Sequence, residues 1–167
     1  EEITMALKDL EFDSIDVLAH ILRRCLAKGY DCGYTKAQKL LYCCYGSILG
    51  LYGVRLTIEH PKCWQLGPVF PRSYNAHKKG RINNNTNDPI IDAPEWVSFV
   101  VDNAIDYFGS WTANQLVLWT HGIDTPWYVS SMGGADLYKD VNDNLIANYF
   151  KKITTLGKDD PRPENGI

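Results

Sequence analysis

Residues 35–53 read TKAQKLLYCCYGSILGLYG, and this stretch sets the helical class of the fold. Thr35 and Gln38 have the spacing of a capping box, in which each side chain satisfies a backbone N–H that the first turn leaves free. Apolar residues then recur at three- or four-residue spacing on one helical face, namely Leu41, Cys44, Ile48 and Leu51. The pattern predicts an amphipathic helix that ends at Gly53.

Similar patterns predict five further helices, at residues 14–28, 71–79, 95–109, 112–121 and 145–153. Asp13 and Ser14 offer an N-cap for the first of these, and Gly29 follows it as a C-terminal stop. Thr112 and Gln115 repeat the capping-box spacing. The sequence therefore predicts a mainly α fold, a compact single-domain bundle of about six helices.

Little β structure is expected. Residues 54–58 alternate apolar and polar side chains before Pro61, which predicts a short edge strand that pairs near residues 63–66. A hairpin or edge strands are thus expected near residues 54–66. The Asn-rich segment within residues 81–94 is predicted to be a long polar loop. The domain is expected over residues 1–156, with residues 157–167 as a flexible tail.

Composition narrows the classes of function. The chain has 167 residues, which suits one domain, and a net charge of −3, which gives no general attraction to nucleic acid. No apolar run reaches the roughly 18 residues that cross a bilayer, and the first residues do not resemble a signal peptide. Five cysteines, an odd number, favour a reducing compartment. We expect a cytoplasmic protein without a membrane partner.

Reactive centres are poorly supported by the sequence. His60 and Cys63 form only half of a zinc-site spacing. Cys43 and Cys44 lie about two turns into their helix, beyond the reach of its N-terminal dipole, so we interpret them as core residues. We predict no catalytic residue, no metal and no cofactor. Residues 77–81 carry a local positive patch, which is also typical of a solvated helix end.

Two stiff corners stand out instead. In the first, residues 64–71, Gly67 and two prolines restrict the backbone and hold the directions of Trp64, Val69 and Phe70. Such a corner either covers the core or contacts a partner, because aromatic side chains serve both roles. The second corner is residues 119–127. His121 there is expected at a helix C-terminus, either bonding the loop closed or contacting a partner.

The order of short motifs supports one family. QKLLY occupies residues 38–42, LYG residues 51–53 and GPV residues 67–69, and TH at 120–121 is followed by PW at 126–127. Together they resemble the Panacea domain, the family of SocA-like antitoxins and GepA-like phage-associated proteins. The resemblance covers residues 14–150, nearly the whole chain. Cys43 and Cys44 depart from it, since aromatic or small residues commonly follow the Leu-Leu-Tyr run.

The resemblance implies a helical antitoxin that neutralises a cognate toxin by direct contact, and in the SocA branch an adaptor that delivers the toxin to the ClpXP protease. We expect the partner-binding surface at both corners, formed by Trp64, Gly67, Pro68, Val69, Tyr74, His121 and Trp127. Nucleic acid is not an expected partner.

Two alternatives stay open. One is a hydrolase or transferase that uses Cys44 or Cys63 with His121. The other is a phage-encoded regulator of a host protein or of DNA, with Lys78, Lys79 and Arg81 as its electrostatic footprint.

Overall fold

Helices dominate the computed structural model, which describes residues 8–82, 88–90 and 92–156. The described residues form seven helices and one two-stranded antiparallel sheet, which confirms the mainly α prediction of a compact single domain. The elements are α1 (Ser14–Lys28), α2 (Tyr34–Tyr52), β1 (Lys62–Trp64), β2 (Gly67–Val69), α3 (Pro71–Lys78), α4 (Glu95–Gly109), α5 (Ala113–Thr120), α6 (Pro126–Ser130) and α7 (Asp143–Leu156). The predicted Asn-rich loop, in part, and the predicted tail lie outside the described residues.

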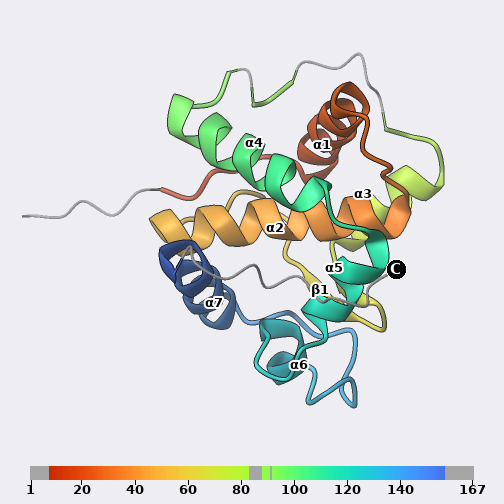
Figure 1. Ribbon diagram of the computed structural model, residues 1–167, viewed down its shortest axis with the longest axis vertical. Coiled ribbons are helices and arrows are strands. Elements are labelled where there is room, and N and C mark those ends of the chain that lie inside the picture. The colour runs from red at the N-terminus through yellow and green to blue at the C-terminus, as the bar shows by residue number, and fades with distance from the viewer. Residues whose placement is uncertain (1–7, 83–87, 91, 157–167) are drawn as a thin grey trace, which may run out of the picture.

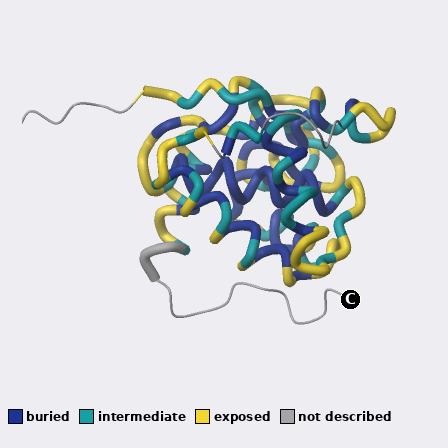
Figure 2. Tube along the Cα trace, turned by 90° about the horizontal axis from the view of Figure 1, so that it is seen from above, coloured by how far each residue is buried: buried dark blue, intermediate teal, exposed yellow. Residues whose placement is uncertain are grey.

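Helix α2 runs through the middle of the molecule, with α4 on one side and α7 on the other (Figure 1). Every residue from 36 to 49 is buried, so α2 is enclosed on all sides, and the buried segments form the centre of the tube in Figure 2. The predicted one-sided apolar face was therefore wrong for this helix, and Leu51 is exposed. A helix surrounded by other elements buries its whole circumference rather than one stripe.

Glycines in α2 allow α7 to pack closely against it. A Cβ at Gly46 would collide with the ring of Phe150, and a Cβ at Gly50 would lie 2.7 Å from the backbone nitrogen of Lys151. Small residues at a helix crossing let the two backbones approach. These glycines therefore serve helix packing.

Most predicted helix ends are confirmed. The Asp13 carboxylate accepts from the N–H of Ile15 at 2.9 Å, and Gly29 ends α1 in the left-handed conformation with φ 74°. The Thr112–Gln115 capping box is present in both directions, at 3.0 and 2.9 Å. The Thr35–Gln38 box was wrong, because Gly33 is the N-cap of α2 and the Gln38 amide is engaged elsewhere.

The predicted strand at residues 54–58 was wrong. That segment runs beside residues 10–12, with a single parallel bridge between Phe12 and Thr57. The hairpin lies further along the chain, where Lys62 pairs with Val69 and Trp64 with Gly67 around a two-residue turn. An alternating pattern indicates which side chains face the core but does not identify the neighbouring strand.

The seventh helix, α6, was not predicted from the sequence. The Thr125 hydroxyl accepts from the N–H of Tyr128 at 3.3 Å, and Pro126 occupies the first turn. The residues interpreted as a stiff turn therefore begin a helix, since a threonine cap followed by proline suits a helix start equally well.

Among the described residues, no helix combines the length and the apolar character that a bilayer crossing requires.

Candidate functional site

The two predicted corners meet in space. The indole Nε1 of Trp127 donates a hydrogen bond to the backbone oxygen of Trp64 at 2.8 Å. His121 Nε2 lies 2.8 Å from the backbone oxygen of Gln65. Segments about 60 residues apart in the sequence thus form one unit, in which the α5–α6 connection holds the tip of the hairpin.

His121 holds this connection at both ring nitrogens. Its Nδ1 lies 2.6 Å from the backbone oxygen of Val117, one turn back in α5, and its ring packs on Trp127 with 4.1 Å between centroids. Carbonyl oxygens only accept hydrogen bonds, so both contacts are hydrogen bonds only when the ring carries two N–H groups. His121 therefore bonds the loop closed, as one of the two sequence interpretations held.

Gly67, Pro68 and Trp127 lie beneath the surface. Trp127 is 4% exposed, and both Gly67 and Pro68 are buried. Gly67 has φ +110°, and a Cβ there would lie 2.7 Å from Cε of Lys39 and 2.6 Å from the hydroxyl of Thr120. These three predicted site residues set the position of the hairpin rather than present atoms to a partner.

A cavity of about 260 Å³ lies beside the hairpin, and we call it the hairpin cavity. Trp64, Val69 and Tyr74 line it, so three predicted site residues do come together there. The Trp64 ring meets the Tyr74 ring edge to face at 5.3 Å and the Tyr138 ring at 6.5 Å. The other residues that line the hairpin cavity are Thr35, Gln38, Lys39, Gln65 and Leu66. The cavity therefore has aromatic walls and polar groups from α2.

Gln38 and Lys39 bind the hairpin to α2. The Gln38 Oε1 accepts from the N–H of Phe70 at 2.8 Å, and its Nε2 donates to the Ser73 hydroxyl at 3.1 Å. Lys39 is 0% exposed and donates from Nζ to the backbone oxygen of Pro68 at 2.9 Å. Burial lowers the pKa of this amine to about 7, because a charged ammonium is poorly solvated there.

Sequence reasoning missed Tyr138, which forms the exposed apolar rim of the cavity together with Leu66 of the first corner. Tyr138 is 71% exposed and Leu66 is 53% exposed. Tyr138 adopts φ +70°, which is uncommon for an aromatic residue, and its N–H donates to the Cys63 oxygen at 2.6 Å. The position of Tyr138 depends on the pairing of its loop with the free edge of β1. Residues 131–140 show no periodic pattern from which this pairing could be predicted.

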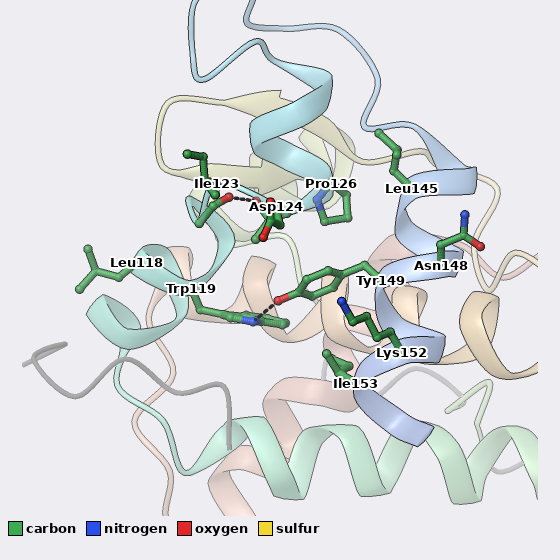
Figure 3. A pocket seen from close by; sticks show the side chains of 12 residues that line it. Leu118, Trp119, Ile123, Asp124, Pro126, Leu145, Asn148, Tyr149, Lys152 and Ile153 are labelled. Carbon is green, nitrogen blue, oxygen red and sulfur yellow. Dashed lines mark hydrogen bonds between the residues drawn. The ribbon is translucent and has the colours of Figure 1, made fainter. Parts of the chain in front are cut away.

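A second hollow lies between α5, α6 and α7, and we call it the α5–α7 groove. It has a volume of about 590 Å³, and residues 122–126 of the second corner line it together with apolar residues of α7 (Figure 3). The Trp119 indole donates to the Tyr149 hydroxyl at 2.8 Å across its floor. His121 stands between the two hollows, since it bonds Gln65 on one side and precedes Gly122 on the other.

The residues considered as reactive centres, Cys44, Cys63 and His60, do not line either hollow. Cys44 is fully buried and its thiol contacts the Val101 oxygen at 3.8 Å, and burial raises its pKa. Burial also raises the pKa of Cys63 to about 11. His60 lies 3.4 Å from both Tyr45 and Asp143. Within the described part of the chain, no three metal-binding side chains cluster.

The positive patch packs against an aromatic ring. His77 meets Tyr34 edge to face at 4.5 Å, and the Lys78 ammonium lies 4.7 Å above the same ring. Burial lowers the pKa of His77, which therefore adds no charge near neutral pH.

Comparisons of this chain with protein-family models, with curated proteins and with solved structures found no match.

Proposed function

We propose that this chain is an antitoxin-type protein-binding module, which neutralises a cognate toxin through a face formed by the two joined corners. The single observation that supports it most is the contact between them, Trp127 to Trp64 and His121 to Gln65. These contacts bring together three of the motifs that resemble the Panacea domain, GPV at residues 67–69, TH at 120–121 and PW at 126–127. The proposal includes the adaptor variant, in which a protease such as ClpXP then degrades the toxin.

The face has the chemistry of a protein interface. Trp64 and Tyr74 are half-buried, while Leu66, Tyr138 and Ile123 are largely exposed. Aromatic anchors next to hollows are typical of interface hot spots, where a few residues provide most of the binding energy. The backbone beneath them is fixed by buried hydrogen bonds, which lowers the entropy lost on binding.

The burial of Cys44 and Cys63 disfavours the enzyme alternative. A cysteine nucleophile acts as the thiolate, and both thiols have raised pKa values. His121 also directs both nitrogens to backbone oxygens. A cytoplasmic location fits the proposal, since all five cysteines are free thiols.

The test uses the reading frame next to the gene for this chain. Expression of this neighbouring protein alone should arrest bacterial growth, and co-expression of this chain should restore growth. The two proteins should then purify as a heterocomplex. Growth arrest that this chain does not relieve, or relief without a complex, would overturn the proposal. A Phe99→Ala variant is the matched control, because Phe99 is 69% exposed on α4 and lines neither hollow.

A further inference from the structure

Lys39 is a buried amine whose hydrogen-bond partner is neutral. Its side chain is 0% exposed, and its one hydrogen bond goes to the neutral oxygen of Pro68 at 2.9 Å. An ammonium has three N–H groups, so two of them are not used by this bond. Among the residues that the structure describes, no carboxylate forms an ion pair with it. Burying a charge is costly unless it is paired, and the hydrogen-bond partner of this amine is neutral.

Lys36 is a second buried lysine of α2 and lies outside the hairpin cavity. It lies three residues earlier in α2, is 6% exposed and donates from Nζ to the backbone oxygen of Gly109 at 2.8 Å. It does not line the hairpin cavity, whereas Lys39 does. Lys36 lines a different cavity, of about 660 Å³, together with Tyr30, Tyr34 and Trp111, and its ammonium lies 5.8 Å from the centroid of the Tyr30 ring. The two lysines thus have similar burial but belong to separate cavities, so Lys36 is a matched control for Lys39.

The shape of the hairpin cavity suits a flat apolar group. Trp64, Tyr74 and Tyr138 line the cavity together, and the Trp64 ring packs edge-on with the other two rings at 5.3 and 6.5 Å between centroids. The volume of about 260 Å³ is enough for a single ring with a short side chain. Tyr138 is held at φ +70°, and such strain often accompanies a ligand site.

We propose that the hairpin cavity binds a carboxylate carried on an aromatic ring, with Lys39 as its counter-ion and the rings of Trp64, Tyr74 and Tyr138 around its apolar part. The carboxylate supplies the negative charge that the buried amine lacks, and a low-dielectric site strengthens this attraction. The depressed pKa of the amine fits this arrangement, because burial is its largest cause and an added carboxylate would favour the charged form. The proposal concerns ligand binding and does not depend on the antitoxin function.

Phenylacetate and its uncharged analogue phenylacetamide test this site in the purified full chain. Amide chemical shifts of Trp64, Val69 and Tyr74 are followed by NMR at pH 6, where the amine is protonated. We expect phenylacetate to shift these signals and to bind at least tenfold more tightly than phenylacetamide. Equal affinities, or no shifts in the hairpin with phenylacetate, would overturn the proposal.

Two variants assign the charge to its residue. Lys39→Met keeps an unbranched side chain without the ammonium and should lower phenylacetate affinity at least tenfold, whereas Lys36→Met should keep wild-type affinity. Tyr138→Ala is a second test that does not disturb the core, because the side chain is exposed, and it should weaken binding several-fold. Unchanged binding in Tyr138→Ala, or equal losses in both lysine variants, would contradict the proposal.

The same chemistry occurs in a free acid and in an aromatic residue at a chain end. The peptide acetyl-Gly-Gly-Gly-Phe with a free carboxylate separates these sources. Tighter binding of the peptide assigns the site to a chain terminus, and tighter binding of phenylacetate assigns it to a small acid; both results support the carboxylate site. Failure of both probes would overturn it and leave the toxin complex to be judged by its own test.

Discussion

Trp127 donates its indole N–H to the backbone oxygen of Trp64 at 2.8 Å, and this bond links helix α6 to strand β1. Trp127 itself is almost completely buried, while the Trp64 ring stands in the wall of the hairpin cavity. The bond therefore connects the core of one predicted corner to the exposed part of the other. It explains why two motifs that are distant in the sequence contribute to one face.

Replacement of Trp127 by phenylalanine removes the indole N–H and leaves the Trp64 oxygen without this donor. We expect a loss of about 1–3 kcal/mol in the free energy of unfolding, measured by urea denaturation. Toxin affinity should fall as well, because the hairpin is less firmly held. Trp96→Phe is the control, since Trp96 packs on Tyr52 and lines neither hollow. The interpretation fails if both variants bind toxin with equal affinity.

Gly67, the one glycine of the hairpin, should tolerate substitution poorly. An alanine there meets Lys39 and Thr120 and also adopts an unfavourable positive φ, so Gly67→Ala should cost roughly 2–4 kcal/mol of stability. Gly53→Ala is the matched control, because Gly53 has φ 69° and open space around its Cα. It should cost about 1 kcal/mol from backbone strain alone. Equal losses of stability would show that close packing at Gly67 is not important.

Lys39 should make stability depend on pH. Its pKa is about 7 in the folded chain, whereas an unfolded lysine titrates at about 10.4. Between these values the unfolded chain binds more protons, so the free energy of unfolding should rise with pH, at roughly 1 kcal/mol per unit. The ionisable groups near Lys39 are Cys43, one turn later in α2, and Tyr74 and Tyr138, which line the same cavity.

Comparison with Lys39→Met isolates this contribution, because those other groups titrate in both proteins. The difference between wild type and Lys39→Met should change steadily from pH 7 to pH 9.5 in urea unfolding followed by circular dichroism. A difference that stays constant with pH would mean that Lys39 keeps its ordinary pKa in the folded state.

Much of the helical architecture could be predicted from local signals. The caps at Asp13 and Thr112 and the stop at Gly29 act within one turn of the chain, so the sequence shows them directly. The predicted capping box at Thr35–Gln38 was wrong, because a local pattern does not show which distant group a side chain binds. It matches a local pattern, but the Gln38 amide is used by the distant N–H of Phe70.

The site could be predicted only in part. Trp64, Val69 and Tyr74 were expected at the surface and do line one cavity. Lys39 was not among the predicted site residues. It lies one turn before Cys43, which was predicted to be in the core, and this spacing would have indicated that Lys39 is buried. Tyr138 had no comparable signal, because its position follows from pairing between a loop and the edge of β1.

The most direct test of the partner-binding face is the affinity of the purified toxin for three variants, measured by isothermal titration calorimetry. Trp64→Ala and Tyr138→Ala should each weaken binding by tenfold or more, while Phe99→Ala, an exposed aromatic residue outside both hollows, should bind like wild type. Circular dichroism confirms that each variant is folded. Wild-type affinity in folded Trp64→Ala and Tyr138→Ala would contradict a partner-binding role for this face.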